Sequence, residues 1–253
     1  MRANLVRRAV APALLAPAIS AQAYDLSEQL SLGGMLAAVG QCQDVSARLP
    51  DEDGVLSKYD NTCRGGMAVQ LEVSLRPDAA NELFLKLGFG ADNGLNPVSP
   101  WALARWAADL EDDVKDINGS GRDYLLTAWY KHSFVFDDQR TLGASFGILD
   151  SADYLDGNEY ANDEYTQFMN EAFVNSGSYG LPSYAPGAAL EWTSGPWSLN
   201  AVGLNVAEND GGNNFNFWGV QAGYEADTAL GTGNYRLILA GTSSDFLDPD
   251  GAK

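Results

Sequence analysis

Met67-Ala-Val-Gln-Leu-Glu-Val-Ser-Leu75, followed after a short polar turn by Leu83-Phe-Leu-Lys-Leu-Gly-Phe89, decides the fold of this chain. In each arm every second side chain is apolar, and a period of two residues indicates a β-strand. Residues 76–81 between the arms include a proline, an aspartate and an asparagine, which favour a turn. The region therefore predicts an antiparallel hairpin. Each arm has about ten residues, the number that a tilted strand needs to cross a bilayer, although a soluble two-sheet sandwich would show the same alternation.

Seven further segments have strand-like patterns, which makes about nine strands in all. The connections between the first seven strands alternate in length, with roughly 24, 6, 31, 4, 35 and 3 residues, as in outer-membrane barrels with long outer loops and short periplasmic turns. A soluble sandwich has no reason to collect its long loops at one end, so the pattern favours a barrel wall. The seven segments are residues 30–41, 122–136, 141–149, 185–193, 197–206, 215–225 and 235–243.

Aromatic residues gather near the ends of the predicted strands. Such residues form girdles at the two interfaces of membrane barrels, and packing inside a soluble core is the alternative for each of them. They are Tyr124, Phe134, Phe136, Trp192, Trp197, Phe215, Phe217, Trp218 and Tyr235.

Residues 1–23 have the features of a secretory signal peptide. Three arginines form a basic start, a modest apolar stretch follows, and Ala21-Gln22-Ala23 resembles a cleavage site. We therefore expect residues 24–253 to be the mature domain. Removing three of the 15 basic residues leaves 12 against 34 acidic ones, a net charge of −22. A chain so acidic is not expected to bind nucleic acid.

Cys42 and Cys63 are the only cysteines. An exported chain meets an oxidising compartment in which two cysteines can pair. Closing a loop of about twenty residues would stabilise the fold by roughly 3 kcal/mol in the chain-entropy model. A metal site is the alternative, but the sequence has no second cysteine pair and no histidine near the first. We predict a disulfide, no metal and no cofactor.

Two of the long connections contain helix signals. Ser99 and Pro100 form a favourable helix start before the alanine-rich residues 101–110. Residues 162–174 combine a capping-type start with apolar residues at helical spacing. We expect a short helix in each connection. The acidic residues 109–116 lack the spacing of a calcium loop, which favours a hydrated surface over a divalent cation site.

No set of residues in the sequence matches an enzyme. The segment Gly143-Ala-Ser-Phe-Gly147 has the spacing of a nucleophile elbow, but Ser145 lies within a predicted strand and the single histidine, His132, precedes it. The sequence contains neither a phosphate-binding loop nor a dinucleotide fingerprint. We expect a protein that is not an enzyme.

Five segments carry a family resemblance: residues 83–96, 106–116, 160–168, 186–192 and 245–251. Together they resemble the carbohydrate-selective outer-membrane porin family of Gram-negative bacteria, from the first predicted strand to the last residue. Membership would imply an all-β antiparallel transmembrane barrel of about 16 strands, with outer loops folded into the pore. Because single-chain bacterial barrels close with an even number of strands, we expect the nine strands here to be the N-terminal part of a wall truncated at the C-terminus.

The resemblance and the alternation together indicate residues that would line the pore. Glu72, Lys86 and Lys131 belong to the set expected to face the lumen. The two predicted loop helices would add aromatic faces for sugar rings and polar groups for their hydroxyls. Solvated helices that only brace each other are the alternative. The loop candidates are Trp101, Arg105, Trp106, Asn162, Asp163, Glu164 and Gln167.

Three functions remain open from the sequence. The first is an outer-membrane channel for passive diffusion of glucose and related sugars, surrounded by lipid and lipopolysaccharide, as a monomer or a homotrimer. The second is a general porin for ions and small solutes, which liposome swelling with sugars against amino acids would distinguish. The third is a secreted sugar-binding β protein, which would stay soluble without detergent.

Overall fold

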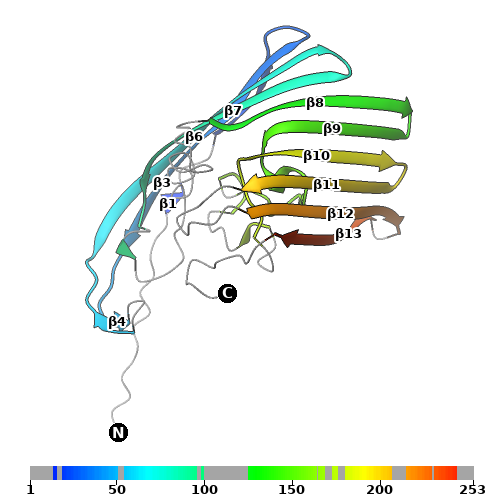
Figure 1. Ribbon diagram of the computed structural model, residues 1–253. Coiled ribbons are helices and arrows are strands. Elements are labelled where there is room, and N and C mark those ends of the chain that lie inside the picture. Colours follow the sequence, from blue (N-terminus) through cyan, green and yellow to red (C-terminus); the bar gives the residue numbers. More distant parts are fainter. Residues whose placement is uncertain are drawn as a thin grey trace.

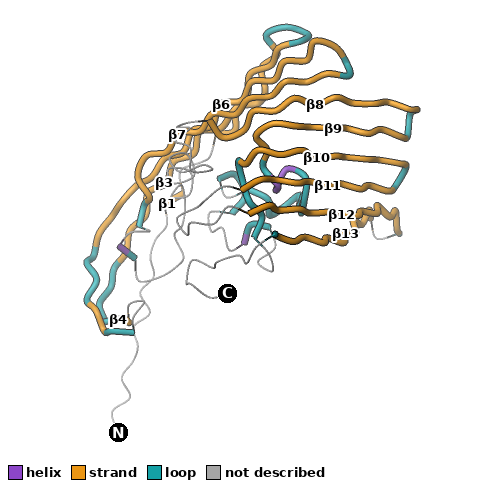
Figure 2. Tube along the Cα trace, viewed as in Figure 1, coloured by secondary structure: helices purple, strands orange, loops and turns teal. Residues whose placement is uncertain are grey.

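The computed structural model describes residues 14–15, 19–50, 54–95, 98–99, 125–163, 165–168, 173–175, 180–206, 215–229 and 231–243. This part of the chain is all-β apart from short 3-10 turns, and most of its strands form a single antiparallel sheet (Figures 1 and 2). The elements are β1 (Leu14–Leu15), β2 (Ile19–Asp25), β3 (Leu30–Gln43), β4 (Leu49–Pro50), β5 (Leu56–Ser57), β6 (Thr62–Asp78), β7 (Asn81–Asn93), β8 (Leu125–Asp137), β9 (Arg140–Leu149), the 3-10 helix η3 (Ser151–Asp153), β10 (Ala185–Ser194), β11 (Trp197–Val206), β12 (Phe215–Thr228) and β13 (Gly231–Thr242).

Nine long strands follow one another in the sheet in the order of the chain, from β3 and β6 through to β13. The short strands β1 and β2 both pair with β3, on its other side from β6, and β4 and β5 form a separate small hairpin. The sheet curves strongly around a hollow (Figure 1). Within the described residues its two ends do not pair, so the sheet is an open trough. The predicted all-β antiparallel fold is confirmed, and the nine long strands correspond to the nine predicted segments, whereas β1, β2, β4 and β5 were not predicted.

All the short connections lie at one end of the sheet. Two-residue turns at 79–80, 138–139, 195–196 and 229–230 join consecutive strands. Aspartates set the first two of them: Asp78 Oδ1 accepts a hydrogen bond from the Ala80 amide at 2.8 Å, and Asp137 Oδ1 accepts one from the Gln139 amide at 3.0 Å. The first turn is therefore narrower than the predicted 76–81, because the strands continue up to the aspartate that closes it. The strand ends at Gln43, Asn93, Leu149 and Val206, where the longer connections begin, lie at the opposite end.

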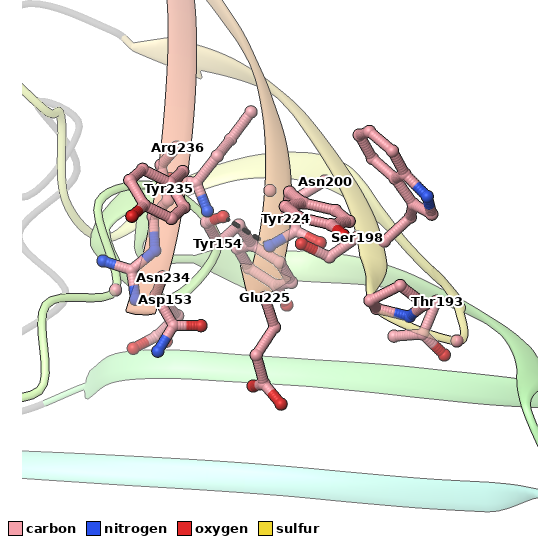
Figure 3. Close-up of a pocket in the computed structure, with 16 residues that line it drawn as sticks. Asp153, Tyr154, Thr193, Ser198, Asn200, Tyr224, Glu225, Asn234, Tyr235 and Arg236 are labelled. Carbon is pink, nitrogen blue, oxygen red and sulfur yellow. Dashed lines mark hydrogen bonds between the residues drawn. The ribbon is translucent and has the colours of Figure 1, made fainter. Parts of the chain in front are cut away.

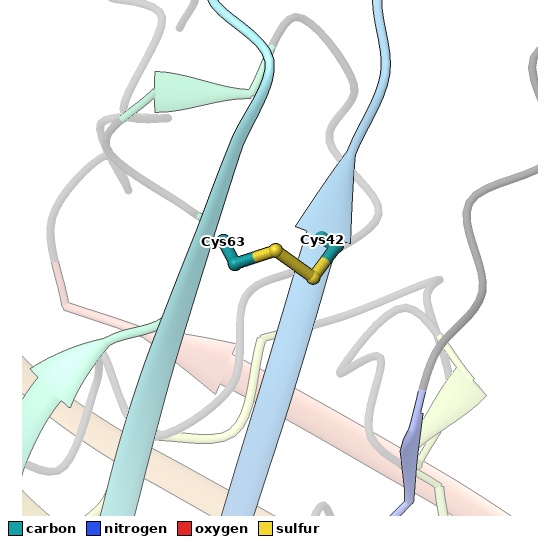
Figure 4. The surroundings of a disulfide bond; sticks show 2 residues. All are labelled: Cys42 and Cys63. Atoms are coloured by element: carbon teal, nitrogen blue, oxygen red, sulfur yellow. A yellow bond between two sulfur atoms is a disulfide. The ribbon is translucent and has the colours of Figure 1, made fainter.

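The disulfide between Cys42 and Cys63 joins β3 and β6 near this opposite end (Figure 4). The two residues are direct register partners, with their Cα atoms 4.1 Å apart. The strands extend to Gln43 and from Thr62, so the cysteines lie inside the sheet and not in the polar loop predicted for residues 42–65. A cross-strand pair of this kind holds the hairpin together where the chain leaves it.

The buried apolar residues form two clusters. Both clusters lie on the face of the sheet that encloses the hollow, which we call the concave face. In the first, Tyr165 packs against buried residues of β3, β6 and β8. In the second, Tyr154 and Leu155 pack against β10, β11 and β12. One connection, residues 150–184, therefore contacts strands from both halves of the sheet, which is possible only if it folds into the hollow.

The predicted helix at residues 162–174 is wrong for the part that the structure describes. The side chain of Asp163 accepts hydrogen bonds from the Tyr165 and Thr166 amides, as a helix cap would, but only one turn follows. Gln167 side-chain atoms bond to Asn162 and Glu159 backbone groups instead. These local bonds compete with a helix, and burial of Tyr165 in the first cluster fixes the turn. The helix predicted at 101–110 lies outside the described residues.

Candidate functional site

The sheet exposes large apolar side chains on one face and covers polar side chains on the other, which is the reverse of a sheet in a soluble protein. The convex face carries large apolar side chains that are exposed, for example Leu71 at 48% and Leu237 at 65%. The concave face instead buries or half-buries polar groups, among them Gln70, Ser74 and Gln221. In water a sheet normally covers its apolar face and exposes its polar one. The aromatic residues divide accordingly, since Trp197, Trp218 and Tyr235 are exposed on the convex face whereas Phe215 and Phe217 are buried in the second cluster.

Two ion pairs on the concave face link different strands of the sheet. Glu72 of β6 and Lys86 of β7 are register partners, with their charged groups 3.4 Å apart. Lys131 of β8 pairs with Glu191 of β10 and so passes over the intervening strand. Three of the sequence candidates, Glu72, Lys86 and Lys131, therefore lie on the predicted face. Glu191 was missed, although the alternation of β10 places it on the same face as buried Ala189.

The first residues of the 150–184 connection are held firmly against the concave face. Asp150 Oδ1 accepts a hydrogen bond from the Ala152 amide at 2.9 Å and so caps η3. Ser151 donates from both its amide and its hydroxyl to the Pro182 carbonyl, at 3.2 and 2.6 Å, which closes the base of the connection. A 3-10 turn was not predicted here, although the Asp-Ser pair at 150–151 is a typical capping sequence.

Two amide side chains of the wall attach to the backbone that follows η3. Asn200 Nδ2 of β11 donates to the Tyr154 carbonyl at 2.8 Å, and Gln221 Oε1 of β12 accepts from the Asp156 amide at 2.7 Å. Between them Leu155 is fully buried against Gly219, where an added Cβ would lie 2.3 Å from Leu155 Cδ1. We call residues 150–156 the inward segment. It is fixed to the wall by polar and apolar contacts together.

Asp153 at the end of η3 lies where the charges of both halves of the sheet converge. Loss of hydration on burial raises the pKa of its carboxyl to about 7. The Asp150 carboxylate adds to this shift, and the Lys86 ammonium opposes it. The adjacent Tyr154 is buried, and burial raises the pKa of its phenol.

A cavity of about 380 Å³ lies between the inward segment and the turn-side halves of β10 to β13 (Figure 3). Its lining residues include amide and hydroxyl side chains, two carboxyl groups and a guanidinium. Figure 3 shows Asp153, Asn234 and Arg236 on one side of the cavity and Ser198 and Asn200 on the other. The sequence reading did not single out this site, because its lining comes from four strands and a loop that are separated along the chain.

The loop candidates have different positions. Asn162, Asp163 and Gln167 lie in the described turn and are engaged in the local hydrogen bonds given above. None of them lines the cavity. Glu164, Trp101, Arg105 and Trp106 lie outside the described residues. A sugar-contacting role for these seven residues therefore stays a prediction.

Within the described ranges, no group of three or more metal-ligating side chains could hold an ion. Among the helices of that part, none is long and apolar enough to cross a membrane.

The fold and the site define an all-β protein whose large antiparallel sheet has an exposed apolar convex face and a concave face that carries ion pairs and amides beside two buried apolar clusters. Comparison with known proteins adds one relative. The chain is 46% identical over 84 residues, 33% of its length, to an uncharacterized protein of Aquifex aeolicus (strain VF5). The matched segment spans only 26% of that protein. No family model matches the chain, and no solved structure matches it.

Proposed function

We propose that this chain forms part of the wall of an outer-membrane β-barrel channel through which carbohydrates such as glucose diffuse passively. The convex face would contact lipid and lipopolysaccharide, and the concave face would line the pore. The observation that carries the proposal is the inverted polarity of the sheet: large apolar side chains are exposed on the side away from the hollow, and ion pairs and amides lie inside it.

The arrangement of the connections supports the same function. Two-residue turns at one end and long connections at the other are typical of outer-membrane barrels. The inward segment lies on the concave face and is attached to β11 and β12, so it would narrow the pore of a closed wall. In a closed wall the two edge strands of the sheet would be paired, because unpaired edges are not tolerated in lipid.

The polar groups of the concave face favour sugars among small solutes. The hollow offers paired charges, such as Glu72 with Lys86 and Lys131 with Glu191, together with neutral amides. Such groups donate to and accept from hydroxyls. A general porin for ions and other small solutes is the second candidate, and the same paired charges would serve it.

Solute uptake by vesicles tests the proposal. The full chain is purified from membranes in detergent and inserted into liposomes, and swelling is measured with glucose, a disaccharide and amino acids of similar size. We expect swelling, with faster entry of glucose than of amino acids. Equal rates would favour the general porin. A protein that remains in the aqueous fraction without detergent and does not permeabilise liposomes would contradict both.

A pair of matched variants tests whether the convex face contacts lipid. Leu71→Lys puts a charge on this face within β6, whereas Tyr160→Lys changes an exposed aromatic residue of a loop. If the convex face contacts hydrocarbon, the first substitution costs about 2–4 kcal/mol in urea unfolding from lipid. The loop variant should stay within about 0.5 kcal/mol. A small effect of both would contradict lipid contact.

A further inference from the structure

We infer that the cavity between the inward segment and strands β10 to β13 is a binding site for a single neutral sugar ring. The inference rests on the proposed function and adds the location of a binding site within the channel. The site lies on the turn side of the inward segment, so a solute would be held after it has passed the narrowest part of the pore and not within it.

The position follows from the residues that form the cavity. Asp153 and Tyr154 contribute to its wall from the inward segment, and Gly157 follows them in the same connection. The remaining lining residues come from the β10–β11 turn and the adjoining parts of β10, β11, β12 and β13. The cavity walls are anchored, because Asn200 and Gln221 each hold the inward segment by a hydrogen bond to its backbone. A site whose parts are fixed in this way loses little conformational entropy when it binds a ligand.

The chemistry of the lining selects the class of ligand. Asn234, Ser198 and Thr193 offer uncharged donors and acceptors, and Arg236 offers a planar set of donors. Asp153 and Glu225 bring two carboxylates against this one guanidinium. The charge balance therefore disfavours an anion, while a neutral ring with several hydroxyls finds both donors and acceptors.

The size of the cavity limits the ligand. Its volume of about 380 Å³ is near the lower end of the range for small-molecule sites. A monosaccharide suits this volume better than an oligosaccharide. Figure 3 shows the Glu225 side chain extending away from the other labelled lining residues.

Block of ion conductance by sugars tests the inference on the full chain in planar bilayers. We expect glucose to reduce the conductance of the unaltered protein in a saturable way, and gluconate, the anionic analogue, to need a several-fold higher concentration. Arg236→Gln should raise the half-blocking concentration of glucose about ten- to hundredfold, the loss expected for a hydrogen bond from a charged donor. Asn234→Ala should raise it as well, and this smaller change is the second variant if Arg236→Gln does not fold.

The matched control is Arg76→Gln, which removes an equal charge from the concave face outside the cavity, where Arg76 pairs with Glu82. Its half-blocking concentration should stay within about twofold of that of the unaltered protein, since exposed ion pairs contribute little. Conductance with unchanged block in both cavity variants, or equal block by glucose and gluconate, would overturn the binding site and leave the channel in place. Absence of any conductance would instead overturn the proposed function.

Discussion

Lys131 of β8 and Glu191 of β10 form an ion pair across β9, the strand that lies between theirs. The pair passes over Gly143, where an added Cβ would lie 2.7 Å from Lys131 Cε. A side chain at this position would therefore occupy the space through which the lysine reaches its partner. A glycine therefore suits this position within the strand because it leaves room for the Lys131 side chain, and not because the backbone requires it.

Gly143→Ala should displace the Lys131 ammonium from Glu191 at little cost to the fold. The atom in the way is near the end of a flexible side chain, and both partners are partly exposed, so the loss should be about 0–1 kcal/mol. Urea unfolding in detergent measures it. The double variant with Glu191→Gln should show no further loss, because the ion pair is already broken. A loss well above 2 kcal/mol for Gly143→Ala alone would contradict this account.

Gly219→Ala should have a much larger effect, because the added Cβ would meet Leu155 Cδ1 at 2.3 Å in the buried second cluster. Overpacking of this kind costs about 1–3 kcal/mol, and it would push the inward segment away from β12. We expect lower stability and, in bilayers, a changed single-channel conductance. Gly203→Ala is the control, since nothing lies closer than 4.0 Å to a Cβ built there. Equal effects of the two substitutions would show that the inward segment is not held at this point.

The stability of the protein should fall as the pH rises from about 4 toward 7, because Asp153 loses its proton in this range. The raised pKa means that the folded state holds this proton more tightly than the unfolded state. Folding is therefore opposed by deprotonation in the window between the ordinary aspartate pKa and the raised one. Thermal unfolding of the unaltered protein and of Asp153→Asn, measured across this window, tests the assignment. The variant should lose this part of the pH dependence, and an identical pH profile for both proteins would contradict it.

Loss of the Cys42–Cys63 disulfide should loosen the long-connection end of the β3–β6 hairpin. The bond joins residues separated by 21 positions, and removing such a link costs about 3 kcal/mol in the chain-entropy model. In the Cys42→Ser and Cys63→Ser double variant, hydrogen exchange should increase first at residues 44–61 and in the adjoining strand ends. Exchange in β10 to β12 should hardly change. Uniformly faster exchange throughout the sheet would be the contrary result.

The site could be predicted from the sequence only where it depends on strand alternation. That period placed Glu72, Lys86 and Lys131 on one face, and the same reasoning applied to β10 would have added Glu191. The helix at residues 162–174 was wrong because Asp163 and Gln167 satisfy nearby backbone groups and Tyr165 is taken into a distant cluster. Helical spacing is a local signal, and here a long-range contact outweighed it.

By itself the amino-acid sequence determined the strands, their order, the short turns and the two faces of the sheet. These follow from neighbouring residues, since a period of two and an aspartate in a turn act over a few positions. Only the tertiary structure decided that residues 150–156 fold into the hollow, that Asp153 lies among charges from β6, β7 and β10, and that a cavity forms beside β13. Those features depend on hydrogen bonds and packing between residues up to 65 positions apart, which no local pattern records.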